Sequence, residues 1–331
     1  MTRKGRPPNV AIVLTTRMGS ERQLGKVFTD IVGKPLIHWI TARLDEIGKV
    51  IIGTTADPRN DVLEQWGKDN GYSVYRHPDE SDVIGRIMAA VEQYHPTAQY
   101  IMRGLNDCPF IVPEFANRAV SLMKQYNGDS MYWVLPPFTE ALYGATEFPR
   151  SRKAWDIIAA NARNDEREHP DLYFHRHRDQ FNIIYHEPPP ARYFRPYRLE
   201  VDWKEDIALI RKIAEAHGRL PAMEEAVSFL DRDDALYRIN RHRIEKTGMS
   251  VSYLQRDRAK WWDLMRGKSI VMWDDTTWEF GEDGEPVFCK AKLCLLGVTR
   301  HNKLYQRDAI IEGDAFLKCP CGAGRRWQAR V

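Results

Sequence analysis

Long hydrophobic runs are missing from this chain of 331 residues. None of its apolar stretches approaches the roughly 18 residues that a membrane-spanning helix needs. The first eight residues also lack the apolar core of a secretory signal peptide. We therefore expect a cytoplasmic protein that has no membrane partner.

Cysteine is scarce and unevenly placed. Of five cysteines, one stands at position 108 and four are clustered near the end of the chain. This pattern argues against the disulfide framework of a small secreted protein. Clustered thiols in a reducing compartment favour a structural Zn²⁺ site, although these C-x4-C and C-x-C spacings are less specific than C-x-x-C, and buried thiols of a small core remain the alternative. The candidate zinc ligands are Cys289, Cys294, Cys319 and Cys321.

An excess of one charge is missing as well. The chain holds 49 Lys and Arg against 46 Asp and Glu, a net charge of +3, which gives no support for general nucleic-acid binding. Residues 251–331 carry 14 basic and 11 acidic side chains, so the excess lies in this tail. We expect two domains, residues 1–248 and a small Trp- and Cys-containing, zinc-ribbon-like module at 249–331. Only that module is a candidate for binding nucleic acid. Within it, the sequence at residues 270–280 predicts a strand or hairpin.

What the sequence does contain is a regular alternation of short apolar runs and helical patterns. Because βαβ units place parallel strands in one helix-covered sheet, the pattern predicts an α/β fold with helices on both faces. Buried strands are predicted at Val10–Leu14, Lys49–Thr55, Tyr72–Arg76 and Tyr100–Arg103. Further strands are predicted at Met131–Leu135, Phe181–Tyr185 and Arg198–Val201, and a helix at Lys204–His217.

The ten residues that follow the first strand, Arg17–Lys26, are rich in cations and glycine. Ligands of open α/β sheets bind where strands end, and this loop begins at such an end. Glycines let backbone N–H groups approach a polyphosphate, while arginine and lysine neutralise its charge. The loop therefore predicts a phosphate site, with a solvated basic loop as the alternative.

Two aspartates stand directly after predicted strands. Asp107 follows the fourth strand, and Asp202 follows the predicted strand Arg198–Val201. Carboxylates beside a polyphosphate site are suitable Mg²⁺ ligands. Taken singly, Asp107 is explained by an Asx turn and Asp202 by a helix N-cap. Their pairing at one edge of the sheet favours the metal role.

The loop also carries a family signature. Arg17-Met18-Gly19-Ser20-Glu21-Arg22-Gln23-Leu24-Gly25-Lys26-Val27 resembles the pattern R-M-G-S-x-R-L-P-G-K-V of cytidylyltransferases that act on acylneuraminate or 3-deoxy-manno-octulosonate, and is nearest to the spore-coat polysaccharide synthesis subgroup. Further elements follow in the family's order, and the resemblance covers residues 9–245. They are Gly33-Lys34-Pro35-Leu36, Thr54-Thr55-Ala56-Asp57-Pro58, Asp107-Cys108-Pro109, Arg167-Glu168-His169 and Val201-Asp202-Trp203-Lys204-Glu205-Asp206.

This resemblance implies a Rossmann-like nucleotidyltransferase with the mixed sheet of nucleotide-diphospho-sugar transferases. It implies an enzyme that uses Mg²⁺ to convert CTP and a sugar or sugar acid into a CMP-sugar and pyrophosphate. We also expect the enzyme to be a homodimer. By position, the triphosphate would be held by Arg17, Ser20, Arg22 and Lys26, and the base would meet main-chain groups near Thr15 and Thr16. Arg103 would join the nucleotide site, Asp107 and Asp202 would bind Mg²⁺, and catalysis would depend on Lys26, Arg17, Asp107 and Asp202.

Two departures from the family pattern leave alternatives open. Gln23-Leu24 replaces Leu-Pro in the loop, and Asn106 replaces the glycine before Asp107. One alternative is a nucleotide- or nucleic-acid-binding protein that has lost catalysis, and another is a transferase with a different nucleotide or acceptor. A basic stretch at residues 150–178 is expected to face an acidic acceptor, or else to form a solvated helix face.

Overall fold

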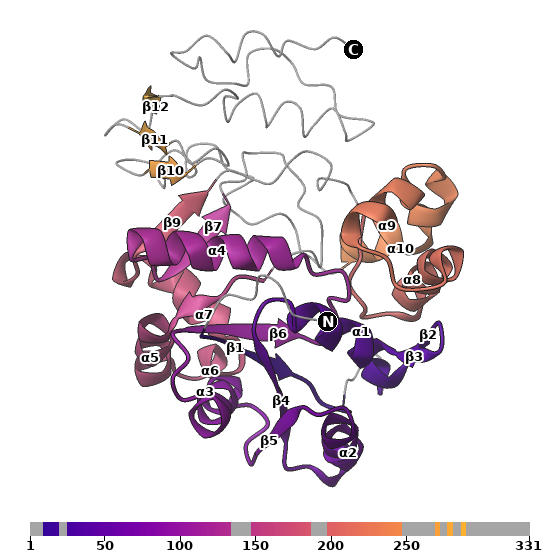
Figure 1. Cartoon of the computed structure of the whole chain (residues 1–331), viewed down its shortest axis with the longest axis horizontal. Coiled ribbons are helices and arrows are strands. Elements are labelled where there is room, and N and C mark those ends of the chain that lie inside the picture. The colour runs from indigo at the N-terminus through magenta and orange to yellow at the C-terminus, as the bar shows by residue number, and fades with distance from the viewer. Residues whose placement is uncertain are drawn as a thin grey trace. The chain divides into compact units, whose positions relative to one another are not determined.

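The computed structural model describes residues 9–19, 25–133, 147–186 and 197–246, together with the backbone of three strands at 269–271, 277–280 and 286–288. A five-stranded sheet at the centre of Figure 1 has the strand order β5-β4-β1-β6-β8. Its strands are β1 (Val10–Thr15), β4 (Lys49–Thr55), β5 (Ser73–His77), β6 (Tyr100–Leu105) and β8 (Arg150–Ser151). The first four are parallel, whereas β8 runs antiparallel to β6. The mixed sheet is therefore confirmed.

Helices connect the parallel strands and cover both faces of the sheet. On one face, α1 packs against β1 and β6 at Gly104. A Cβ added to Gly104 would lie 3.1 Å from Leu44 of α1 and 3.3 Å from Ile12 of β1. On the other face, Ala11 and Val13 pack with α3 and α5. The helices are α1 (Leu36–Leu44), α2 (Asp61–Asp69), α3 (Val83–Tyr94), α4 (Pro113–Tyr126), α5 (Arg152–Asn161), α6 (Asp165–Glu168), α7 (Pro170–Arg176) and α8 (Lys204–His217).

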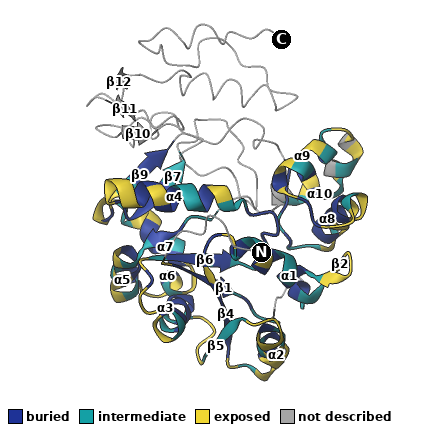
Figure 2. Ribbon diagram, in the orientation of Figure 1, coloured by how far each residue is buried: buried dark blue, intermediate teal, exposed yellow. Residues whose placement is uncertain are grey.

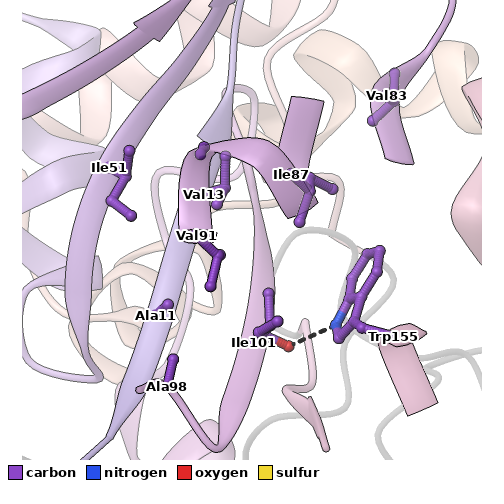
Figure 3. Close-up of a cluster of buried hydrophobic side chains, with 10 residues drawn as sticks. Ala11, Val13, Ile51, Val83, Ile87, Val91, Ala98, Ile101 and Trp155 are labelled. Carbon is purple, nitrogen blue, oxygen red and sulfur yellow. Dashed lines mark hydrogen bonds between the residues drawn. The ribbon is translucent and has the colours of Figure 1, made fainter. Parts of the chain in front are cut away.

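The core between the sheet, α3 and α5 is apolar and closed (Figure 3). Trp155 of α5 is fully buried there, and its indole N–H donates a hydrogen bond of 2.9 Å to the carbonyl of Ile101. Tryptophan combines a large buried area with one polar atom that needs a partner, and this bond provides it. Figure 2 shows the central strands β1 and β4 in dark blue, whereas the edge strand β5 is half-buried. The strands that carry the candidate site are thus held rigidly.

The chain divides into two compact units. The first comprises Met1–Met131, Gly144–Ile183 and Leu199–Met223, and the second comprises the remaining segments. These boundaries differ from the division expected at residue 248, which stays a prediction.

A second sheet has the strand order β12-β11-β10-β9-β7. Its strands are β7 (Ser130–Trp133), β9 (Ile183–His186), β10 (Ser269–Val271), β11 (Thr277–Phe280) and β12 (Pro286–Phe288), and helices α9 (Met223–Leu230) and α10 (Asp234–Lys246) precede β10 in the chain. The antiparallel pair β10–β11 confirms the hairpin expected at residues 270–280. The four clustered cysteines lie outside the described residues. Within the described ranges, no helix is long and apolar enough to cross a membrane.

One predicted strand is wrong. Arg198 forms an isolated β-bridge, and residues 199–201 belong to no strand. This segment contacts the end of β6, where the N–H of Val201 donates to the carbonyl of Asp107 at 2.8 Å. A segment with buried apolar residues can thus dock on a sheet without forming a full strand of it.

Candidate functional site

The candidate site lies at the carboxyl edge of the first sheet, within the first compact unit. Thr15 ends β1 and pairs with Gly53 of β4 on one side and with Leu105 of β6 on the other. The loops that leave β1 and β6 therefore start beside each other. The next residue, Thr16, is buried, and its N–H donates to the carbonyl of Gly53 at 3.1 Å.

The loop after β1 returns at Gly25 and Lys26. Gly25 has a φ of 63°, a left-handed conformation that glycine adopts without strain, and its N–H donates to the carbonyl of Met18 at 3.2 Å. The turn directs Lys26 inward, where only 6% of the residue is exposed. Its ammonium donates to the Val201 carbonyl at 2.8 Å.

The same ammonium joins the two predicted metal ligands. It lies 3.2 Å from a carboxylate oxygen of Asp202 and 3.4 Å from one of Asp107. Three residues from distant parts of the chain thus form one charged cluster. Within it, one buried cation faces two partly exposed carboxylates.

The helix that follows Asp202 is capped by another residue. The N-cap position of α8 is Trp203, so the N-cap explanation of Asp202 is wrong. The fully buried Asp206 accepts hydrogen bonds of 2.9 Å from the N–H groups of both Asp202 and Trp203. Asp206 therefore fixes the backbone that carries Asp202.

The donor set fits Mg²⁺. No group of three or more His, Cys, Asp or Glu side chains suited to a metal occurs in the described part of the chain. Mg²⁺ does not need such a cage, because it commonly takes one or two carboxylates and completes its shell with water and substrate phosphates. Asp107 and Asp202 already converge on one cation, the Lys26 ammonium.

Three arginines gather at this edge. Arg17 forms an ion pair with Glu80, and Arg103 donates to the hydroxyl of Thr15 at 3.4 Å. The third is Arg86 of α3, which sequence reasoning missed. Burial and the charges of Arg17 and Arg103 lower its pKa to about 10. The signal available in the sequence was a charged residue at an inward position of an apolar helix face.

Asn106, the departure from the family pattern, points at the same edge. Its side-chain amide donates to the hydroxyl of Thr16 at 3.1 Å. The side chain that replaces glycine is therefore anchored beside the residues predicted to meet the base.

A second charged cluster, formed by Glu147, Asp171, Arg150 and Arg103, was also missed. Asp171 of α7 forms an ion pair with Arg150 of β8 and lies 3.8 Å from Arg103 of β6. Burial alone would raise the pKa of Asp171, but these arginines hold it at about 2. Burial and the charge of Asp171 raise the pKa of Glu147 to about 8. Two neighbouring carboxyl groups thus have pKa values far apart.

The rest of the basic stretch at residues 150–178 is largely paired locally. Arg167 forms an ion pair of 2.6 Å with Asp82, the N-cap of α3. Arg176 pairs with Asp165 and Glu166, and Arg152 pairs with Glu92. These arginines support helices, whereas Arg150 faces the cluster around Asp171.

The predicted phosphate ligands Ser20 and Arg22 lie outside the described residues, as do Gln23 and Leu24.

Comparison with known proteins gives a consistent result. The family model described as Cytidylyltransferase matches residues 10–229. The chain is 25% identical over 235 residues to the spore coat polysaccharide biosynthesis protein SpsF of Bacillus subtilis, covering 68% of this chain and 95% of that protein. It is 24% identical over 247 residues to a 3-deoxy-manno-octulosonate cytidylyltransferase of Bradyrhizobium diazoefficiens, covering 68% and 98%.

The fold is similar to that of a solved cytidylyltransferase from Leptospira borgpetersenii serovar Hardjo-bovis. The TM-score is 0.60 at 22% identity, and the match covers 69% of this chain and 96% of the other. The residues matched by the family model, 10–229, include Lys26, Asp107 and Asp202.

Proposed function

The chain belongs to the cytidylyltransferase family, and we propose that it transfers a cytidylyl group from CTP to a sugar acid in a Mg²⁺-dependent reaction that releases pyrophosphate. The observation that carries this proposal is the convergence of Lys26, Asp107 and Asp202 at the carboxyl edge of the sheet. The matched relatives named for 3-deoxy-manno-octulosonate and for spore-coat polysaccharide support a sugar-acid or related acceptor.

In this proposal the triphosphate lies along the loop from Arg17 to Lys26, where Ser20 and Arg22 also take part. The base meets main-chain groups near Thr15 and Thr16, which stand at the junction of β1 with β4 and β6. Nucleotidyl transfer needs positioning and charge neutralisation more than covalent help, and a loop of cations supplies both.

Asp107 and Asp202 would hold the Mg²⁺. When bound, the ion would neutralise charge that develops on the α-phosphate and on the departing pyrophosphate. Lys26 already lies between the two carboxylates, so it provides a second positive charge at the same point. Asp206 serves as a positioning residue, because it fixes the backbone of Asp202.

The acceptor would enter from the side of Arg103, Arg150 and Asp171. Its hydroxyl oxygen forms a bond to the α-phosphorus as the bond to pyrophosphate breaks, and the hydroxyl proton passes to solvent water. Arg150 is a cation that suits the carboxylate of a sugar acid, since a guanidinium binds a carboxylate through two parallel hydrogen bonds, while Arg103 is assigned to the nucleotide.

The proposal is tested by incubating the protein with Mg²⁺, each nucleoside triphosphate in turn, and a panel of sugars and sugar acids. We expect pyrophosphate and a CMP-sugar, detected by mass, with CTP only. Asp107→Ala and Asp202→Ala should each abolish the product while the chain stays folded by circular dichroism. No product from any nucleotide and acceptor, with the fold intact, would contradict the proposal.

A second candidate function is nucleotide binding without catalysis. The observation that favours it is the bond between Asn106 and Thr16, which places a side chain where the family pattern has glycine. CTP binding with no turnover across the whole panel would support this alternative. Salt-dependent nucleic-acid binding that is lost when residues 250–331 are deleted would assign that function to the C-terminal module.

The zinc site and the homodimer stay predictions. The four candidate zinc ligands, Cys289, Cys294, Cys319 and Cys321, belong to the part of the chain outside the described residues. Metal analysis of the reduced protein should find about one zinc per chain, and clearly less would reject a site made of all four thiols. Light scattering on the purified protein measures the oligomeric state.

A further inference from the structure

Arg86 is a charged side chain on the buried face of α3. It lies among Val83, Ile84, Ile87, Ala90 and Val91, the other inward residues of this helix. Only 3% of Arg86 is exposed. Arginine is seldom buried to this extent unless it is paired, so its surroundings call for an explanation.

The stem of Arg86 reaches the carboxyl edge of the sheet by way of Gly53. A Cβ at Gly53 would stand 3.5 Å from Cδ of Arg86 and only 2.6 Å from Cγ1 of Val13. Gly53 pairs with Thr15, the last residue of β1. The absence of a side chain at position 53 thus lets the stem pack beside the point where the nucleotide site begins.

The guanidinium lacks a counter-ion in the described part of the chain. One terminal nitrogen donates to the backbone carbonyl of Glu80 at 2.7 Å, while the buried Nε has no acceptor among the described residues. No carboxylate of those residues forms an ion pair with it. A buried charge is costly unless a partner compensates it.

Two like charges make this arrangement still less favourable. After burial, the charges of Arg17 and Arg103 lower the pKa of Arg86, and the weaker opposing effects of the Asp82 and Asp79 carboxylates do not offset them. Arg17 is paired with the Glu80 carboxylate, and Arg103 lies near Asp171. Glu80 links the group, because its carboxylate binds Arg17 and its carbonyl binds Arg86. Arg86 is therefore the member of the trio whose charge is least compensated.

We infer that Arg86 is a phosphate-binding residue of the nucleotide site and that the triphosphate of the bound nucleotide is its counter-ion. This inference rests on the proposed function. Three guanidinium groups at one edge match a ligand with several negative charges better than a neutral base or ribose, because charge-assisted bonds to phosphate are the strong ones. Arg86 would approach the phosphates from α3, opposite the loop that carries Arg17 and Lys26.

The test compares wild-type protein with Arg86→Met, which keeps an apolar stem beside Gly53 and removes the charge. Calorimetric titration in MgCl₂ with sodium tripolyphosphate, CTP and cytidine separates phosphate binding from base binding. We expect tripolyphosphate and CTP to bind about 10- to 100-fold more weakly to the variant, and cytidine to bind equally to both proteins. Arg86→Lys, which keeps the charge, should fall between them.

Thermal unfolding without ligand distinguishes a binding role from a structural one. If Arg86 only stabilised the fold, its replacement would lower the Tm. Removal of an uncompensated buried charge should leave the Tm of Arg86→Met unchanged or higher. The matched control is Arg43→Met, since Arg43 of α1 also donates to backbone carbonyls, those of Leu220 and Pro221. This control should lower the Tm and leave tripolyphosphate binding unchanged.

Tripolyphosphate binding within about twofold of wild type in Arg86→Met would overturn the inference, as would a lower Tm together with weaker cytidine binding. If wild type forms a CMP-sugar but Arg86→Met binds tripolyphosphate normally, the inference alone fails. If tripolyphosphate binding depends on Arg86 but no acceptor yields product, the inference stands and the proposed function fails.

Discussion

The N–H of Val201 donates a hydrogen bond of 2.8 Å to the carbonyl of Asp107, and the carbonyl of Val201 accepts one of 2.8 Å from Lys26. One peptide segment is thus attached both to the end of β6 and to the end of the loop that follows β1. This attachment places Asp202 beside Asp107.

Replacement of Lys26 by Met should abolish turnover and destabilise the protein. The variant leaves the carboxylates of Asp107 and Asp202 without their shared cation. Because both are partly exposed, we expect the free energy of unfolding at pH 7 to fall by about 1–3 kcal/mol. Urea unfolding measures this loss, and MgCl₂ should recover part of it. An unchanged unfolding midpoint, or no response to MgCl₂, would contradict the prediction.

Asp206→Ala should weaken the proposed Mg²⁺ site although Asp206 is not itself a proposed ligand. It removes the acceptor that binds the N–H groups of Asp202 and Trp203. We expect a loss of about 1–3 kcal/mol in stability and a 10- to 100-fold higher Mg²⁺ requirement for turnover. Asp206→Asn, which keeps one acceptor oxygen, serves as the control and should recover much of both. Normal Mg²⁺ dependence in Asp206→Ala would show that the backbone of Asp202 is held by other contacts.

The bond between Asn106 and Thr16 should be measurable as a coupling energy. Asn106→Ala and Thr16→Val each remove one partner of the 3.1 Å hydrogen bond. A double-mutant cycle followed by urea unfolding should give about 0.5–1.5 kcal/mol. A coupling near zero would mean that the two side chains do not interact in solution.

Stability should fall as the pH rises from 6.5 to 8.5, a range above the lowered pKa of His175, and Glu147 should be the cause. Burial beside Asp171 raises the pKa of Glu147 from 4.5 to about 8, so between these values the folded state binds more protons than the unfolded state. The stabilisation is complete below pH 4.5 and is lost as the pH passes 8. Since Glu147 is only half-buried, we expect at least about 1 kcal/mol rather than the full linkage value.

Urea unfolding in EDTA at the two pH values tests this prediction. Glu147→Gln should remove most of the difference, whereas the exposed control Glu46→Gln should not. Asp171 has the opposite sign, because its pKa is depressed to about 2, so the stability it contributes is present above pH 3.8 and lost below. The same pH slope in wild type and Glu147→Gln would rule out Glu147 as its source.

The four parallel strands of the first sheet could be predicted closely, most clearly β1 and β4, which are short, buried and β-branched, whereas the antiparallel β8 was not among the expected strands. Lys49–Thr55 matches β4 at both ends, and Val10–Leu14 differs from β1 by one residue. The prediction failed at Arg198–Val201, because the residue pattern does not reveal whether the backbone forms a full ladder or only an isolated bridge and a docking bond. Helix α4, which begins at Pro113, was not among the expected elements.

The candidate site was predictable where a loop or a strand end concentrates charge, as at Lys26, Asp107 and Asp202. Arg86 and Asp171 could not be found in this way. Each is a single charged residue in a helix, and its significance comes from partners that the fold supplies from other elements. Asp171 depends on Arg150 and Arg103, and Arg86 on the positions of Gly53 and Glu80.

Lys26 and Asp202 are 176 residues apart in the chain, so the site that they share can form only after most of the first unit has been synthesised. A nascent chain that has emerged only as far as α4 already contains β1, β4, β5 and β6, yet its Asp107 has no second carboxylate beside it. Contacts between such distant residues form late, because the intervening chain must first be ordered. A ligand that requires both aspartates therefore binds only the completed first unit and stabilises it against unfolding by mass action. Protection from proteolysis by Mg²⁺ and CTP would then report that synthesis and folding have passed residue 202.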